Sequence, residues 1–401
     1  MGYQRCLRSV AAACVIAIVS GGHAGAAPST DAKAADVRTT DPGIAMGNLE
    51  AQIRLLERAR WDTLAGGQRA ALIELLTAHA RYTGRIAELG RALALAEGWA
   101  KASPSDPTAM LARARARAGF HRFAAALADL DLAAALGASP ATVAGVRAGI
   151  YQATGRYQEA FALRSAAARR NPSSDNLGAL ASLHAERGDV PEAARLFEAA
   201  RQQYRDVSPF PYAFLLFDEG AMWMRHGNLD RARDRFAAAL RHLPSYATAQ
   251  CHLGEVEAAL GNSDRAIALL EPLAEGADDP DAAGQLARVL ADAGQTAAAE
   301  RWSRRAAQRY DTLLASYPDA FADHAAEFWL AAGQDPRRAL TLAQRNLALR
   351  QTPRAYELLI TAALADGRTD VACQAATGAR SAGAQSAALT EVLTRTTTAC
   401  N

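Results

Sequence analysis

One glycine-and-alanine pattern recurs along most of this sequence and constrains its fold more than any other feature. In WMRHGNLDRARDRFAAALRHLP (223–244) and YQATGRYQEAFALRSAAARRNP (151–172), a glycine is followed by alanines five and twelve residues later, then by a proline five residues further on. Similar units recur every 33–34 residues, with two longer intervals of 39. A period of this length, filled by two amphipathic helices and a tight turn, is typical of a solenoid. No strand pattern competes, so the sequence predicts an all-α fold.

Each position of the pattern has a physical reason. A glycine permits the left-handed turn between two helices, and an alanine lets two helix backbones approach closely. Bulky residues one helical turn beyond the alanine, such as Phe197, Phe236 and Leu270, fill the remaining space. The turn glycines are Gly155, Gly188, Gly227, Gly261, Gly294, Gly333 and Gly367, followed five or six residues later by Ala160, Ala193, Ala232, Ala266, Ala299, Ala339 and Ala372.

The unit CHLGEVEAALGNSDRAIALLEPL (251–273) resembles the tetratricopeptide repeat (TPR) family. Leu253 and Gly254 match the family's leucine–glycine pair, Gly261 its turn glycine, and Ala266 its small residue. The preceding unit matches at Gly220, Trp223, Gly227, Ala232, Phe236, Ala239 and Pro244, although Glu219 stands where leucine is usual. Upstream, Ala126 and Ala92 continue the spacing, whereas Gly119 and Gly84 lie out of register.

The resemblance covers roughly residues 66–380. It implies a right-handed superhelical solenoid of about eight to nine helix-turn-helix repeats, which we assign to residues 46–384. In this family the first helices of the repeats line a concave face, and that face usually holds a peptide or a partner protein. A terminal helix, SAALTEVLTR (386–395), is expected to fold back as a cap within 385–401.

A second periodicity lies above the first. The sequence of intervals between turn glycines repeats after 106 residues, and Trp223 and Tyr204 recur at that separation as Trp329 and Tyr310. This favours a duplicated module of three units, although two chance insertions at similar places explain it too. Both long intervals carry aromatic residues, so longer second helices are expected there, opening the stack into two specialised pockets.

The first 26 residues have the layout of a cleaved secretory signal. Arg5 and Arg8 precede an apolar run and the small-residue sequence AGA at 24–26. The run is too short to span a bilayer as a mature helix, which needs about 20 residues. A retained anchor and lipidation at Cys14 are the alternatives. Residues 27–45 are expected to form a disordered linker, and the protein is expected to be periplasmic or secreted.

Charge argues against a nucleic-acid partner. Cleavage of the signal leaves 42 basic and 42 acidic residues, so the formal net charge of the mature chain is zero. Acidic residues balance the basic ones, and no run of like charge occurs. Lys33 and Lys101 are the only lysines, and the other basic residues are arginines. No cofactor-binding sequence is present.

The strongest candidate for an enzyme or metal site is YPDAFADHAAEFW (317–329). Asp319, Asp323 and Glu327 recur there at helical spacing beside His324. Carboxylates at i and i+4 with a nearby histidine can bind a divalent ion or share a proton. A charged strip on a helix is more often a solvated face, and no nucleophile or complete ligand set accompanies this one. We therefore expect a non-catalytic scaffold without a metal, and keep an exported enzyme or metal-binding subunit as the alternative.

The family register also predicts a partner-binding surface on the concave side. Apolar anchors and charges of both signs suggest a partner segment of mixed character. Alternatively, Phe214 and Phe217 fill the widened joint before Trp223. The predicted partner-binding residues are Phe214, Phe217, Met224, Arg225, Glu255, Arg288, Asp323, Glu327, Arg354 and Glu357.

Three cysteines remain after signal cleavage, an odd number for a compartment in which disulfides form. Cys373 lies at the start of the last repeat's second helix, and Cys400 follows the terminal helix. A bridge between them would hold the chain end in place. Three buried thiols, including Cys251, are the alternative.

Overall fold

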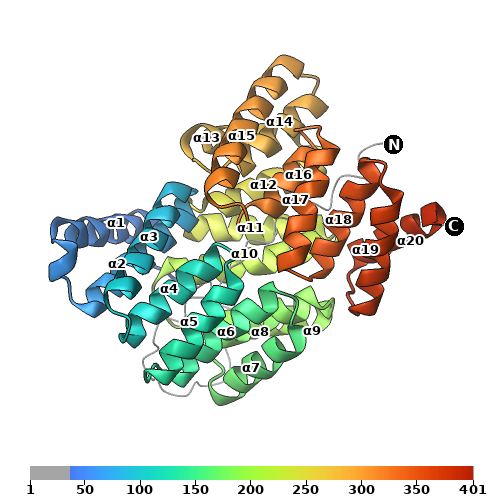
Figure 1. The fold of residues 1–401 in the computed structure, drawn as a ribbon. Coiled ribbons are helices and arrows are strands. Elements are labelled where there is room, and N and C mark those ends of the chain that lie inside the picture. Colours follow the sequence, from blue (N-terminus) through green and yellow to red (C-terminus); the bar gives the residue numbers. More distant parts are fainter. Residues whose placement is uncertain (1–36, 401) are drawn as a thin grey trace.

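The computed structural model describes residues 37–400, and within them it contains twenty α-helices and no strand. The expected signal peptide and residues 27–36 of the expected linker lie outside the described residues. Eighteen of the helices form nine antiparallel hairpins, which confirms the predicted all-α solenoid of TPR-like repeats (Figure 1). The hairpins are α2 (Gly66–Thr83) with α3 (Ile86–Ala102), α4 (Pro107–Gly119) with α5 (Phe123–Ala135), α6 (Pro140–Ala153) with α7 (Tyr157–Arg170), α8 (Ser174–Glu186) with α9 (Val190–Gln202), α10 (Pro209–Arg225) with α11 (Leu229–His242), α12 (Ala247–Ala259) with α13 (Ser263–Gly276), α14 (Asp281–Asp292) with α15 (Thr296–Ser316), α16 (Ala322–Leu330) with α17 (Pro336–Leu349), and α18 (Pro353–Ala365) with α19 (Thr369–Ser381).

Small residues let the two helices of a hairpin approach closely. A Cβ atom placed on Gly220 of α10 would lie 2.7 Å from Cε1 of Phe236 on α11. The same addition to Gly254 of α12 would lie 2.7 Å from Cγ of Leu270 on α13. Glycine on the first helix therefore accommodates a large buried side chain of the second, which explains the spacing in the sequence.

The turns between paired helices correct one sequence assignment. The left-handed residue between α16 and α17 is Gln334 (φ +53°), not the predicted Gly333. Between α4 and α5 it is His121 (φ +57°), five residues before Ala126, so Gly119 lies out of register as expected. Gly84 also lies outside the five-residue spacing, yet it occupies the left-handed turn between α2 and α3 with φ +68°. Gly333 is needed for a different reason, because a Cβ there would lie 2.5 Å from Cε3 of Trp329.

Successive turns of the superhelix touch each other, so the concave side is enclosed. The contacts join residues 191 to 198 positions apart, about the length of six repeats. The Asp278 carboxylate accepts hydrogen bonds from the first N–H groups of α3, and His121 Nδ1 lies 3.0 Å from the Asp319 carbonyl oxygen. The Gln351 N–H donates to the Thr154 carbonyl at 3.3 Å. We call this line of contacts the seam.

The two long intervals are built differently from each other. In the second, α15 is 21 residues long, as the expectation of a longer second helix requires. In the first, α9 has 13 residues, and the extra length lies in the loop 203–208 and in the 17-residue first helix α10. The expectation of longer second helices was therefore wrong at the first joint.

Both ends of the solenoid are covered by a further helix. α1 (Pro42–Arg58), followed by the short 3₁₀ helix η2 (Trp61–Thr63), packs against α2, so the last four residues of the expected linker, 42–45, are helical. α20 (Ala387–Cys400) packs against α18 and α19. Cys373 and Cys400 form a disulfide with a Cα–Cα distance of 5.9 Å, and Cys251 is a free thiol. None of the described helices is long and apolar enough to cross a membrane.

Candidate functional site

The superhelix encloses a large cavity, with a volume of about 1140 Å³, on its inner side. We call it the inner cavity. Most of its lining comes from the first helices α2, α6, α8, α10 and α18, with contributions from α1, α7 and the start of α20. A site of this size takes a drug-sized molecule or a short peptide segment.

One wall of the inner cavity is made of small residues. Ala141, Ala144, Gly145, Ala148 and Gly149 lie at helical spacing on one face of α6, and all five line the cavity. Because these side chains end at Cβ or earlier, an occupant can approach this face of α6 closely. The wall therefore suits a chain with short side chains.

Three half-buried arginines of the cavity have no ion pair with any described residue. Arg164 Nε donates to Gln152 Oε1 at 3.1 Å, and Arg225 Nε donates to the carbonyl of the preceding turn at 3.2 Å. Arg81 lies over the ring of Phe214. In the described part of the chain, none of the three guanidinium groups has a carboxylate oxygen within 4.0 Å. Burial lowers the pKa of Arg164 to about 10, so it is still a cation near neutral pH.

Two half-buried carboxyl groups lie in the same cavity. Burial raises the pKa of Asp218 to about 6, and the Ser182 hydroxyl donates to its Oδ2 at 2.7 Å. Glu186 accepts a hydrogen bond from Gln152 Nε2 at 2.9 Å. Burial, followed by the charge of Glu186, raises the pKa of Tyr157, so this hydroxyl keeps its proton. The cavity therefore combines unpaired cations with acids that are partly protonated or already hydrogen-bonded.

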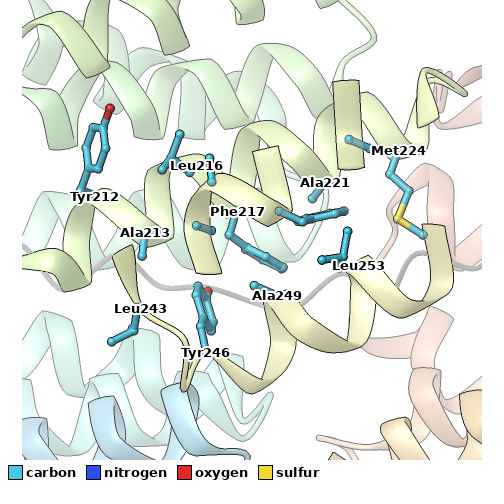
Figure 2. Close-up of a cluster of buried hydrophobic side chains, with 14 of the residues drawn as sticks. Tyr212, Ala213, Leu216, Phe217, Ala221, Met224, Leu243, Tyr246, Ala249 and Leu253 are labelled. Carbon is cyan, nitrogen blue, oxygen red and sulfur yellow. The ribbon is translucent and has the colours of Figure 1, made fainter. Parts of the chain in front are cut away.

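The structure separates the predicted partner-binding residues into two groups. Phe214, Phe217, Arg225, Arg354 and Glu357 line the inner cavity. Phe217 is nevertheless only 3% exposed, and Figure 2 shows it in the buried cluster. Its ring lies 5.2 Å from that of Tyr246 and 5.6 Å from that of Phe236. This arrangement favours the packing alternative for Phe217.

Met224 and the remaining predicted charges do not line the inner cavity. Met224 is 3% exposed and belongs to the same buried cluster as Phe217. Glu255 is 2% exposed and lies 3.4 Å from His252 Nδ1. Arg288 donates to Gln285 of its own helix at 2.7 Å. The register placed these side chains on an accessible surface, whereas Met224 and Glu255 are buried and Arg288 is half-buried.

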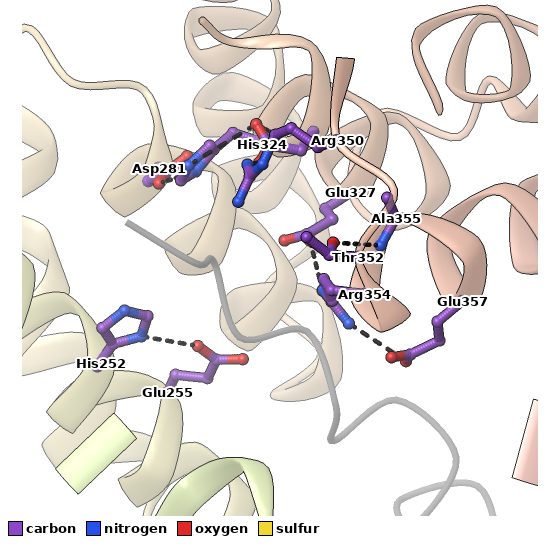
Figure 3. A network of polar contacts seen from close by, with 11 residues as sticks. His252, Glu255, Asp281, His324, Glu327, Arg350, Thr352, Arg354, Ala355 and Glu357 are labelled. Carbon is purple, nitrogen blue, oxygen red and sulfur yellow. Dashed lines mark hydrogen bonds and ion pairs between the residues drawn. The ribbon is translucent and has the colours of Figure 1, made fainter. Parts of the chain in front are cut away.

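Asp323, His324 and Glu327 are held in two groups of ion pairs, and Figure 3 shows the His324–Asp281 and Glu327–Arg354 pairs. His324 Nδ1 lies 2.7 Å from Asp281 Oδ2, and its Nε2 lies 4.0 Å from Asp323 Oδ1. Arg350 Nη1 donates to Asp323 Oδ2 at 2.6 Å. Glu327 belongs to the second group, in which Arg354 pairs with it and also donates to Glu357 at 3.2 Å.

The protonation of these pairs follows from their neighbours. Burial opposes the charged forms, but Asp281 and then Asp323 raise the pKa of His324 above its usual value. His324 and Arg350 in turn lower the pKa of Asp323 to about 2 against the effect of burial. The described residues contain no group of three or more His, Cys, Asp or Glu side chains that can hold a metal ion. The arrangement is one of ion pairs that join α14, α16 and α18.

Sequence reasoning missed most of the polar residues of the inner cavity. Arg164 lies on α7, a second helix, and the family register places second helices on the convex side. Asp281, the partner of His324, lies 43 residues away in another hairpin, so no local spacing links them. Gln152, Glu186 and Asp218 carry no recognisable pattern.

Comparison with known proteins identifies no family. No protein-family model and no curated protein matches the sequence. Similar solved structures include the APC/C hetero-tetramer Cut9–Hcn1 (TM-score 0.49, 14% identity, 87% of this chain and 66% of that chain). A human IFIT1 dimer with PPP-AAAA has a TM-score of 0.49 at 15% identity over 85% of this chain and 79% of that one. MamA has a TM-score of 0.35 at 16% identity over 41% of this chain and 95% of that one. This chain thus spans just under two thirds of the Cut9–Hcn1 chain, and such likenesses assign it no partner.

Proposed function

We propose that this protein is a non-catalytic scaffold that binds a peptide segment of a partner protein in the inner cavity. The observation that carries the proposal is the cavity itself, which helices of the solenoid line with a small-residue wall and with three arginines that have no ion pair to a described residue. A pre-formed site lowers the ordering cost of association on the protein's side. The occupant that fits is a segment with short side chains on one side and at least one carboxylate.

We propose further that the scaffold acts outside the cytoplasm, on a partner of the cell envelope. The layout of residues 1–26 supports this proposal. N-terminal sequencing of the isolated protein is expected to begin at or near Ala27. Protein recovered only from the cytoplasm and starting at Met1 would refute export without affecting the cavity assignment.

Peptide selection tests the binding function. A displayed library of random ten-residue peptides is selected against the immobilised protein, and the affinities of the enriched peptides are measured by calorimetry. Enriched peptides are expected to carry Asp or Glu, and Arg225→Gln is expected to weaken their binding about tenfold or more, because it removes a charge-assisted hydrogen bond worth about 1.5–3 kcal/mol.

Arg301→Gln is the matched control for this substitution. Arg301 lies on α15 and, like Arg225, donates to the carbonyl oxygen four residues earlier, but it is exposed and does not line the cavity. Its replacement is expected to leave the affinity unchanged. Failure to enrich any peptide, or equal effects of the two substitutions, would remove the inner cavity as the binding site.

A further inference from the structure

The first described residues of the chain lie beside the inner cavity. Thr40 lines it, and the Thr40 N–H donates to the Val207 carbonyl at 2.7 Å. Thr39 Oγ1 lies 3.0 Å from His242 Nδ1. Val37 packs against the buried cluster shown in Figure 2, several members of which also line the cavity. The segment 27–36, which precedes Val37, is therefore attached at the cavity.

The composition of this segment suits the cavity. Its sequence is APSTDAKAAD, in which four of the ten residues are alanine. An extended chain of ten residues spans at most about 33–36 Å, so the segment can reach into the cavity from its attachment at Val37. Its short side chains suit the alanine and glycine face of α6 that lines the cavity.

The charges of the segment complement those of the cavity. Asp31 and Asp36 supply two carboxylates. Arg81, Arg164 and Arg225 line the cavity, and in the described residues none of them has a carboxylate within ion-pair distance. The cavity holds carboxyl groups of its own, such as Asp218 and Glu186, but neither lies within ion-pair distance of these half-buried arginines. A carboxylate of the segment bound at one of the arginines would form a charge-assisted hydrogen bond there.

We propose that residues 27–36 bind in the inner cavity and compete there with the partner peptide, so that the chain's own N-terminal segment regulates partner binding. This inference rests on the proposed function, because it assigns the regulator of the same site. A segment tethered at the cavity has an effective concentration in the millimolar range. A partner must therefore displace it, and only a segment that binds more tightly does so at low concentration.

The lysine content of the chain provides a direct test. Lys33 lies inside the segment, and the only other lysine, Lys101, is exposed in the last turn of α3. The full chain is treated with endoproteinase Lys-C, and cleavage at each lysine is followed by intact mass. Arg164→Gln together with Arg225→Gln is expected to speed cleavage at Lys33 at least tenfold and to leave cleavage at Lys101 unchanged. Arg301→Gln is the control and is expected to change neither rate.

A second variant changes only the segment and so leaves every described contact in place. Asp31→Asn with Asp36→Asn is expected to speed cleavage at Lys33 and to tighten the binding of a selected peptide at least threefold. Equal Lys33 rates in the native chain and in both double variants would overturn the inference. A Lys33 rate that changes when the protein is diluted tenfold would also overturn it, because the segment would then bind a second copy.

The two proposals fail in different ways. If selected peptides bind with Arg225 dependence while Lys33 is cleaved equally fast in all variants, the cavity binds a partner and the segment does not compete. If Lys33 is protected and released by the arginine substitutions but no peptide is enriched, the segment occupies the cavity and the proposed partner function fails.

Discussion

Replacing Gly155 with alanine tests whether successive turns of the superhelix are in contact. Gly155 has φ +82° in the turn between α6 and α7, where it faces the backbone of the next superhelical turn. A Cβ atom at this position would lie 2.4 Å from the carbonyl oxygen of Gln351 and 2.8 Å from its carbonyl carbon. Both atoms belong to the main chain, so no side-chain rotation relieves the clash, and the seam has to separate.

The expected cost has two parts. Alanine in the left-handed region costs roughly 1–2 kcal/mol wherever it occurs. Separation of the seam also removes the hydrogen bond from Gln351 N–H to Thr154 and the one from Arg350 Nε to the Ala153 carbonyl, at 3.3 and 3.1 Å. A neutral bond contributes about 0.5–1.5 kcal/mol and one from a charged donor about 1.5–3, so the seam adds about 2–4 kcal/mol.

Gly188→Ala separates the two parts experimentally. Gly188 has φ +81° in the next hairpin, and an added Cβ there meets nothing within 4 Å. Urea unfolding followed by circular dichroism is expected to show a loss of about 1–2 kcal/mol for Gly188→Ala and about 2–4 kcal/mol more for Gly155→Ala. Small-angle scattering is expected to show a larger radius of gyration for Gly155→Ala alone. Equal losses and equal radii for the two variants would refute the closed superhelix.

Two further predictions concern a buried histidine and the chain end. Burial lowers the pKa of His121 to about 4, so its neutral form stabilises the fold fully above about pH 6.5, and that contribution is lost as the pH falls towards 4. The variant His121→Asn tests this, because asparagine tolerates the φ of +57° at this position. The difference in unfolding free energy between the native chain and the variant is expected to shrink by up to about 3 kcal/mol from pH 7 to pH 4. A difference that stays constant with pH would contradict the prediction. Cys400→Ser removes the disulfide between residues 27 positions apart. Hydrogen exchange in α19 and α20 is expected to become faster, with a loss of opening free energy of at most about 3–4 kcal/mol. Cys251→Ser, which removes a free thiol, is expected to leave that exchange unchanged.

The repeat architecture could be predicted because its determinants are local. Gly227, Ala232 and Phe236 lie within one hairpin, and the structure uses them as the spacing indicates, with Ala232 and Phe236 fully buried. The turns at His121 and Gln334 were missed because residues other than glycine adopt the left-handed conformation there. A pattern based on glycine cannot detect such positions, and it misassigned Gly333, where glycine is required by close packing against Trp329 and not by a left-handed φ angle.

The inner cavity could not be predicted in the same way, because it depends on contacts between distant turns. Phe214 and Arg225 were identified from the family register of a single repeat, and both line the cavity. The same register counted Glu255 and Asp323 as accessible, but both are buried, Glu255 beside His252 of its own helix and Asp323 beside Arg350. Nothing in the local sequence states how many repeats complete one turn, and that number decides which positions remain exposed.

The two long intervals are placed where closure of the superhelix needs them. They recur after 106 residues, and one superhelical turn takes 191 to 198, so the two joints lie about half a turn apart. At the first joint, Val207 holds the N-terminal segment through its hydrogen bond to Thr40. At the second, the ring of Tyr317 lies 4.5 Å from that of Phe120 in the preceding turn. The two long intervals have equal length and the same position within the 106-residue module, but they serve different purposes. The first positions Thr40 beside the inner cavity, and the second closes the seam.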